Sequence, residues 1–314
     1  MSPSAALESP IFRIYATIAI LLLVAGGVAI QIVKRTSKRN VEHAWNSYRG
    51  WLIMIPLVFG AIFLGREATI AFFTLLAIYG AKEFARATGL YLDWAMMGVV
   101  YASIIACGIV SLVPDLTTGE PGWYGLFMAL PVYAISSILA VPILRNQSKG
   151  QLQILSLAIL VFIYIGWMFG HVAFLANADH AYGYLFYLLF AVELNDVAAF
   201  ICGRLFGRHP LRSNISPKKT WEGSLGAAGF SLLLPWIFYF SLPEFTPFER
   251  LLAGLIVGVG GQFGDLAISV IKRDLEVKDM GAVLVGHGGI LDRIDSLIFT
   301  APLFFHTTRY FHGL

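Results

Sequence analysis

The chain has 314 residues, of which 58% are hydrophobic and 13% are charged, and its mean hydropathy is +0.74. Soluble domains hold about 25% charged residues, so this composition excludes an ordinary soluble domain and indicates an integral membrane protein. The net charge of +3 is small, and we expect no nucleic-acid partner. Cys107 and Cys202 lie in apolar segments without metal-ligand or disulfide spacing, and we interpret both as packing residues.

Apolar runs of spanning length recur along the whole chain. A helix needs about 20 apolar residues to cross a bilayer. The first run is too long for the core of a signal peptide, so we expect it to remain as a spanning helix. The sequence predicts an all-α, polytopic membrane bundle with about ten transmembrane helices, at residues 12–33, 51–66, 67–84, 95–114, 122–144, 151–176, 182–206, 224–242, 248–271 and 291–311.

The basic residues of this bundle are distributed unequally between its two sides. Short cytoplasmic loops carry an excess of lysine and arginine. With the N-terminus outside, 18 of the 22 basic residues fall in inner loops, and the other four are Arg13, Arg66, Arg250 and Arg309. The sequence therefore predicts a multi-pass protein of the inner cell membrane with its N-terminus outside.

The two halves of the chain differ in where their charges lie. In residues 1–180 nearly all charges stand at helix ends, which predicts helices for anchoring and for the bundle. We interpret His171, in this half, as a hydrogen-bonded core histidine rather than a ligand. Residues 181–314 carry acidic groups inside predicted helices, and we expect the catalytic helices there.

The first chemically informative segment begins inside the seventh predicted span. Glu193 and Asp196 are ionisable groups at membrane depth, which by default mark a functional interior. An ion pair with Arg204 on the same helical stripe is the alternative. Gly203 and Gly207 are four residues apart and allow a close helix approach.

A dense basic loop follows directly after these carboxylates. Ser216-Pro217 is a turn signal within it. Basic inner loops usually only anchor the protein, but this density beside buried acids predicts a phosphate-bearing ligand. The basic residues are Arg208, Arg212, Lys218 and Lys219.

The second segment, residues 264–281, lies at the end of the ninth span. Asp265, Ser269 and Lys272 share one helix face, so a carboxylate, a hydroxyl and a cation point the same way. A polar stripe that only holds the bundle together is the alternative. Arg273 and Lys278 follow at the water boundary.

The third segment, GHGGILDRIDSL, opens the last span. Its glycines allow backbone to approach a ligand closely; they are Gly286, Gly288 and Gly289. Asp292 and Asp295 are neighbours on the first helical turn and repel each other unless a cation lies near. Helix capping explains one of them but not both. His287 and Arg293 complete the cluster.

Together the three segments combine carboxylates with cations. Hard oxygen ligands without a cysteine or histidine cluster argue against zinc and favour magnesium, which takes few carboxylates and several phosphate oxygens. Carboxylates for metal and cations for phosphate are what phosphoryl or nucleotidyl transfer requires. No P-loop motif occurs. The acids are Asp196, Asp265, Asp279, Asp292 and Asp295.

At these residues the chain resembles a known family, the phosphatidate cytidylyltransferases or CDP-diglyceride synthetases. The resemblance covers about residues 190–300. It is carried by SVIKR at 269–273, Lys278-Asp279 and HGGILDRID at 287–295, with Asp196, Gly203-Arg204 and SPKKTWEG at 216–223 as a second motif. Phe200 stands where the family usually has tyrosine, and Asn195 where a small residue is common.

The resemblance implies the reaction of CTP with phosphatidic acid to give CDP-diacylglycerol and pyrophosphate. It also implies Mg²⁺, a second monovalent cation such as K⁺, and a homodimer. Carried over by motif, Asp265 and Asp292 would be the metal carboxylates, and the residues themselves favour the same two because they stand on separate helices. Asp196 and Asp295 are second choices.

We expect the catalytic and substrate-binding side chains around these carboxylates. Lys272, Arg293 and His287 are assigned to catalysis, with His287 orienting a phosphate or an aspartate. The expected substrate-binding residues are Arg204, Ser216, Lys218, Lys219, Ser269, Arg273, Lys278, Gly288 and Gly289.

The expected mechanism is an in-line displacement at the cytoplasmic face of the bilayer. A phosphate monoester is ionised at neutral pH, so no serine nucleophile is needed. Two alternatives remain: a cation- or proton-coupled transporter that uses the buried acids, and a CTP-dependent lipid kinase. The acids cluster toward one face rather than at the midplane, which disfavours a transporter.

Overall fold

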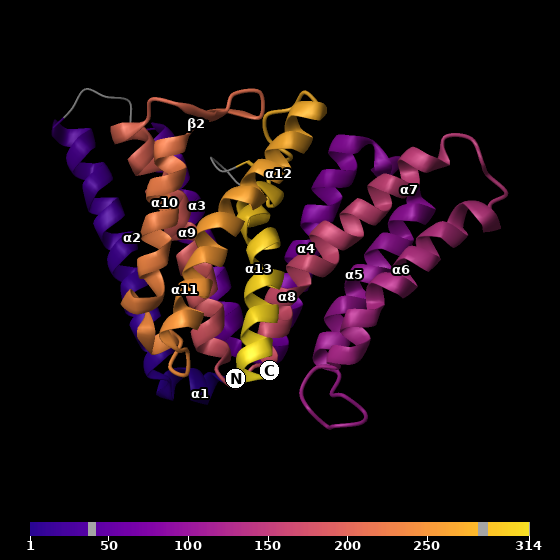
Figure 1. Cartoon of the computed structure of the whole chain (residues 1–314), viewed down its shortest axis with the longest axis horizontal. Coiled ribbons are helices and arrows are strands. Elements are labelled where there is room, and N and C mark those ends of the chain that lie inside the picture. Colours follow the sequence, from indigo (N-terminus) through magenta and orange to yellow (C-terminus); the bar gives the residue numbers. More distant parts are fainter. Residues whose placement is uncertain (37–41, 282–287, 314) are drawn as a thin grey trace.

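The structure is a computed structural model that describes residues 1–36, 42–281 and 288–313. In these ranges it is a bundle of long helices with a single two-stranded hairpin. Eight helical stretches are long and apolar enough to cross a membrane. The helices run between two ends of the molecule, and both termini lie at the same end, the lower one in Figure 1. The chain is therefore a multi-pass membrane protein.

The first half consists of helices only. In chain order they are α1 (Pro3–Glu8), α2 (Pro10–Thr36), α3 (Glu42–Leu64), α4 (Arg66–Thr88), the 3-10 turn η1 (Leu90–Leu92), α5 (Trp94–Leu112), α6 (Tyr124–Leu144), α7 (Gln151–Leu160), the π-helical turn η2 (Val161–Met168), α8 (Phe169–Phe174) and the 3-10 turn η3 (Leu175–Asn177).

The second half adds the hairpin and a second π-helical turn. Its elements are α9 (Ala181–Phe206), β1 (Pro210–Arg212), β2 (Ser216–Thr220), α10 (Trp221–Ile237), the 3-10 turn η4 (Tyr239–Ser241), α11 (Pro247–Leu255), the π-helical turn η5 (Ile256–Gly260), α12 (Gly261–Asp274) and α13 (Leu291–His312).

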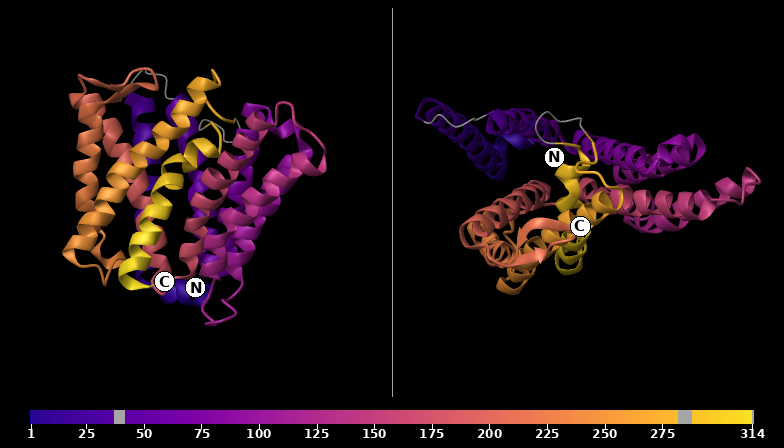
Figure 2. Two further views of the ribbon diagram at one scale, coloured as in Figure 1. Left: turned by 45° about the vertical axis from the view of Figure 1, so that its right-hand side comes forward. Right: turned by 90° about the horizontal axis from the view of Figure 1, so that it is seen from above.

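Each of the ten predicted spans coincides with a helix or a helical stretch, so the prediction of a helical membrane bundle is confirmed. The two that fall outside the eight long apolar stretches are α10, with 17 residues, and α13, with 22 residues and several charges. Helix α10 packs along α9, and α13 packs along α12. Both lie within the bundle in the two views of Figure 2.

Two regular spans of the sequence prediction contain π-helical turns. The turn η2 joins α7 to α8, and η5 joins α11 to α12. Both turns contact α13, whose N-terminal end carries the predicted site. A π-helical turn changes the direction of the side chains that follow it without ending the helix, and apolar periodicity gave no sign of either one.

The basic loop of the sequence prediction is an antiparallel hairpin. Its register pairs Pro210 with Thr220 and Arg212 with Ser216. The prediction of a turn at Ser216-Pro217 was wrong, because these residues begin β2 and the turn precedes them. Pro217 is exposed, and a two-stranded ribbon has only edge strands, where a residue without an N–H is tolerated.

Close packing of α9 against α10 positions this hairpin. A Cβ added at Gly223 would lie 2.8 Å from the carbonyl oxygen of Ala199 and 3.0 Å from the Cα of Gly203. Small residues therefore bring the two backbones together, as the spacing of Gly203 and Gly207 predicted. The hairpin between the helices is held over their charged end.

We expect Gly223→Ala to destabilise the fold by about 1–3 kcal/mol, because the added methyl group must push two backbones apart. The midpoint of thermal unfolding in detergent measures the effect. Gly229→Ala on the same helix is the control, since a Cβ there meets nothing within 4 Å and alanine favours the helix by roughly 1 kcal/mol. Equal midpoints for the two variants would contradict the close approach.

Candidate functional site

The charged side chains of the three sequence segments gather at one end of the bundle. This is the end that carries β2 and the C-terminal end of α12, opposite the two termini (Figure 1). Asp265 comes from α12, Asp292 and Asp295 from the first turns of α13, and Asp196 from α9. The fold thus brings together residues that are far apart in the chain.

Asp265 is partly buried and forms an ion pair with Lys219 of β2. The Ser269 hydroxyl, one turn further along α12, donates to Asp265 Oδ1 at 3.2 Å. The predicted shared face of Asp265 and Ser269 is therefore present. Lys219, which was expected to bind phosphate, is here the partner of a carboxylate.

Asp292 has a partner at each carboxylate oxygen. Its Oδ1 accepts from the Lys272 ammonium at 2.8 Å, and its Oδ2 accepts from the backbone N–H groups of Met280 at 3.0 Å and Gly289 at 3.1 Å. Only 6% of the Asp292 side chain is exposed. This carboxylate therefore joins the end of α12 to the glycine segment before α13.

Asp295 points to a different neighbourhood from Asp292. It is buried, and its Oδ1 accepts from the Ser296 N–H at 2.7 Å, while the Ser296 hydroxyl donates to Asp196 Oδ2 at 3.3 Å. Asp196, Asp265 and Asp295 lie close enough for their charges to act on one another. Of the four predicted metal carboxylates, Asp196, Asp265 and Asp295 therefore act on one another, whereas Asp292 is paired with Lys272.

The alternative, an ion pair of Glu193 or Asp196 with Arg204, is not found in the described residues. Arg204 is exposed. The cation whose charge acts on both Glu193 and Asp196 is Arg293, from the first turn of α13. The polar stripe of α9 is therefore directed at α13.

Oxygen donors dominate this end of the bundle, which suits a hard cation such as Mg²⁺. In the part of the chain that the structure describes, no three His, Cys, Asp or Glu residues are grouped so as to hold a metal ion by themselves. Magnesium needs only one or two carboxylates when substrate phosphates and waters supply the remaining ligands. One or two of the carboxylates of Asp196, Asp265 and Asp295 would suffice for that partial role.

The remaining predicted substrate-binding residues border the cluster. Arg273 donates from Nε to the Ile215 carbonyl at 3.0 Å, which ties the hairpin to α12. Lys218 and Lys278 are exposed, and Ser216 is half-buried at the start of β2. Their roles toward a phosphate stay predictions.

The glycine segment is described on either side of residues 282–287. His287 and Gly286 lie outside the described residues. Gly288 has a φ of +77°, which favours glycine, and a Cβ there would lie 3.2 Å from Asp292 Oδ2. The backbone at Gly288 therefore comes close to the Asp292 carboxylate.

Two side chains of the first half reach the cluster, and sequence reasoning missed both. Glu83 of α4 accepts hydrogen bonds from the start of α13. Tyr164 of η2 lies near Asp265 and Asp295, with its hydroxyl 3.5 Å from the Gly264 carbonyl. The signal that could have identified Glu83 was its place as an acid inside a predicted span. No feature of the sequence marked Tyr164 as part of the site.

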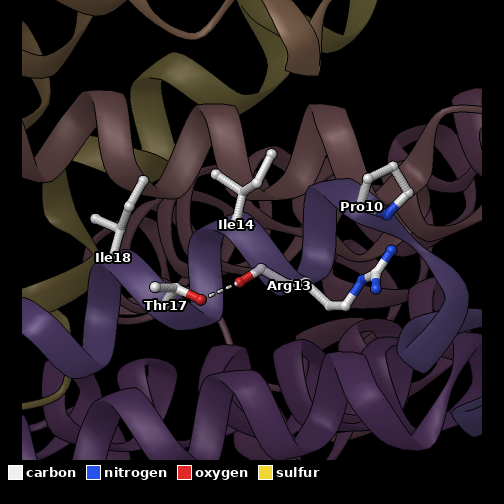
Figure 3. Close-up of a pocket in the computed structure, with 5 residues that line it drawn as sticks. All are labelled: Pro10, Arg13, Ile14, Thr17 and Ile18. Carbon is white, nitrogen blue, oxygen red and sulfur yellow. Dashed lines mark hydrogen bonds between the residues drawn. The ribbon is translucent and has the colours of Figure 1, made fainter.

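A pocket of about 400 Å³ lies at the other end of the bundle. It is lined by the first turns of α2, namely Pro10, Arg13, Ile14, Thr17 and Ile18. Figure 3 shows these side chains, with the Thr17 hydroxyl donating to the Arg13 carbonyl at 2.8 Å. The pocket contains no carboxylate and is remote from the cluster, so it has no part in the candidate site.

Glu222 fastens the hairpin to the start of α10. Its carboxylate accepts from the backbone N–H groups of Arg208 at 3.1 Å and His209 at 3.2 Å, and it pairs with the His209 ring. These hydrogen bonds, with that from Arg208 foremost, lower the pKa of Glu222 from 4.5 to about 2. The hairpin therefore depends on an ionised glutamate.

We expect the hairpin anchor to be lost at acid pH. Because the folded-state pKa lies below the ordinary value, the stabilisation is complete above pH 4.5 and disappears as the pH falls toward 2. The amide proton shifts of Arg208 and His209, followed by NMR, should titrate in that window and should not titrate there in Glu222→Gln. A titration midpoint at 4.5, the ordinary pKa of a glutamate, would contradict the role of Glu222 as the anchor of the hairpin.

Comparison with known proteins gives the family. The model of the cytidylyltransferase family matches residues 46–311. The chain is 31% identical over 302 residues to the uncharacterized protein YnbB of Escherichia coli (strain K12), covering 94% of this chain and 97% of that protein.

Two further relatives carry an activity in their names. The phosphatidate cytidylyltransferase of Staphylococcus haemolyticus (strain JCSC1435) is 31% identical over 253 residues, covering 80% of this chain and 92% of that protein. That of Staphylococcus aureus (strain COL) is 30% identical over 254 residues, covering 80% of this chain and 94% of that protein. The matched region includes the whole carboxylate–lysine cluster, and the chain belongs to the cytidylyltransferase family.

Proposed function

We propose that the protein is a phosphatidate cytidylyltransferase, which joins CTP and phosphatidic acid into CDP-diacylglycerol and releases pyrophosphate. The observation that carries this proposal is the alternation of carboxylates and ammonium groups at one end of the bundle, in the pairs Lys219–Asp265 and Lys272–Asp292. Family membership and the names of two relatives support it.

The paired charges suit a substrate that carries several phosphates. Each lysine can exchange its carboxylate partner for a phosphate oxygen, and at Asp265 a cation can then take the place of Lys219. Asp265, with Asp196 or Asp295 as a second carboxylate, would hold Mg²⁺, which when bound offsets the negative charge on the phosphate oxygens. Lys219 and Lys272 would then orient the triphosphate and the leaving pyrophosphate.

The chemical step needs no protein nucleophile. An oxygen of the lipid phosphate, ionised at neutral pH, forms a bond to the α-phosphorus of CTP. The bond from that phosphorus to the oxygen bridging to the β-phosphate breaks, and pyrophosphate leaves with the electron pair. Ser269, whose hydroxyl donates to Asp265, would orient that carboxylate rather than attack.

The setting of the cluster suits two substrates of different solubility. The charged end of the bundle carries the basic hairpin and most basic loops, as expected of the cytoplasmic side. A lipid headgroup reaches this level from the bilayer, and CTP reaches it from water. We therefore place the active site at the cytoplasmic face of the inner membrane.

We expect purified protein in detergent to move label from α-labelled CTP into lipid when phosphatidic acid and magnesium are present. Asp265→Asn and Asp292→Asn should each lower the rate by about two to three orders of magnitude, the usual cost of losing one preorganised electrostatic contact. Asp115→Asn, a half-buried aspartate in the loop after α5 at the opposite end of the bundle, is the matched control and should leave the rate unchanged.

Several outcomes would contradict the proposal. Lipid labelled from γ-labelled rather than α-labelled CTP would identify a kinase. The absence of label with phosphatidic acid and with other lipid phosphates would reject the enzyme. Label that persists in both aspartate variants would retain the activity and reject the site.

The dependence of the transfer rate on magnesium should differ between the variants of Asp265 and Asp292. Chelation with EDTA should abolish transfer, and Mg²⁺ should restore it. Because Asp292 is held by Lys272 and two backbone amides, Asp265→Asn should raise the magnesium concentration needed for half-maximal rate more than Asp292→Asn does. Equal shifts in both variants would show that the two carboxylates share one ion.

A further inference from the structure

Glu83 is a buried carboxylate that connects the first half of the chain to the candidate site. It lies in the last turns of α4 and is 5% exposed. Its Oε1 accepts from the Ile290 N–H at 3.0 Å, and its Oε2 accepts from the Leu291 N–H at 2.8 Å. Both oxygens are therefore directed at the residues that immediately precede Asp292.

These two hydrogen bonds supply what α13 lacks at its start. The first N–H groups of a helix have no partner within the helix, and Ile290 at the N-cap position offers no side-chain acceptor. A helix is usually capped by the residue at its own N-terminus. Here the cap comes from another helix, and its negative charge also complements the positive end of the helix dipole.

Glu83 and Asp292 both accept hydrogen bonds from the backbone next to the start of α13. Met280 and Gly289 donate to Asp292 Oδ2. A Cβ at Gly289 would lie 2.5 Å from Glu83 Oε2 and 2.8 Å from the Gly281 nitrogen. Residues 280–281 and 288–291 therefore lie side by side, and both carboxylates contact them.

We propose that Glu83 is a positioning residue that sets the place of Asp292 relative to Lys272, an inference that rests on the proposed function of this site. Glu83 fixes the backbone of Ile290 and Leu291, and this fixes where the next side chain begins. Asp292 then reaches Lys272 on α12. In the described residues no hydrogen bond joins Glu83 to either of these side chains, so apart from its negative charge near Asp292 it acts on the reaction through the start of α13.

The central test is Glu83→Gln. Glutamine keeps the size of the side chain but offers only one acceptor oxygen, and its amide group opposes the second backbone N–H. We expect kcat to fall about a hundredfold, as a small misplacement of a reacting group can cause, with little change in KM for CTP. Hydrogen exchange of the amides of Ile290 and Leu291, measured without substrate, should become faster, while α9 and α10 keep their protection.

The control is the same substitution at the other end of the same helix. Glu67 stands in the first turn of α4 with 73% of its side chain exposed. Glu67→Gln should change neither kcat nor the exchange of Ile290 and Leu291. A change in this variant equal to that in Glu83→Gln would overturn the proposal.

A second variant approaches the same contact from the opposite side. Gly289→Ala places a methyl group against Glu83 Oε2 and should also lower kcat and speed exchange at Ile290 and Leu291. If both substitutions break one contact, the kcat of the double variant should be little lower than that of the less active single variant. If the fold-decreases in kcat of the two single variants multiply in the double variant, the substitutions act independently and the shared contact is overturned.

The readouts separate this proposal from the proposed function. Faster exchange confined to the start of α13 in Glu83→Gln supports the anchoring even if the wild-type protein makes no CDP-lipid, which would reject the proposed function alone. Unchanged exchange at Ile290 and Leu291 overturns the proposal. Lower protection throughout the bundle, with kcat retained in the folded fraction, also overturns it, because Glu83 would then be merely structural.

Discussion

Two aspartate–lysine pairs hold together the charged end of an otherwise apolar bundle. A lone charge at membrane depth is costly, and it persists where a partner of opposite sign compensates it. The pair Lys219–Asp265 joins β2 to α12, and Lys272–Asp292 joins α12 to α13. Helix α12 therefore carries one member of each pair. The hairpin, α12 and the start of α13 are thus joined to one another by these two contacts.

The helices could be predicted from the sequence because their signal is local. A run of about 20 apolar residues is sufficient to identify a span, and each predicted span has its helix. The charged segments could also be predicted to meet at one end, since acids inside apolar runs and dense basic loops are visible in the sequence. Asp265 and Ser269 share a face because helical spacing requires it.

Which side chains pair could not be predicted, because pairing is set by contacts between distant parts of the chain. Lys219 was expected at a phosphate and lies at Asp265, and Asp292 and Asp295 face different partners although they stand one turn apart. The π-helical turn that brings Tyr164 to the cluster has no periodic signal. No local pattern indicated that Glu83, near the end of a predicted span, accepts hydrogen bonds from the start of the last helix.

The tethers of the hairpin to α12 close a ring in the structure. From Lys219 the chain descends through α10, turns at the far end of the bundle, rises through α11 and α12 and returns to Lys219 at Asp265 (Figure 1). The Arg273–Ile215 hydrogen bond closes the same ring a second time. Lateral pressure from the lipid therefore acts on a closed frame rather than on separate helices. Rupture of both tethers would open this frame at the charged end, and the hydrogen bond from Gln262 of α12 to the Ser224 carbonyl of α10, at 2.9 Å, would then be left to join the two helices.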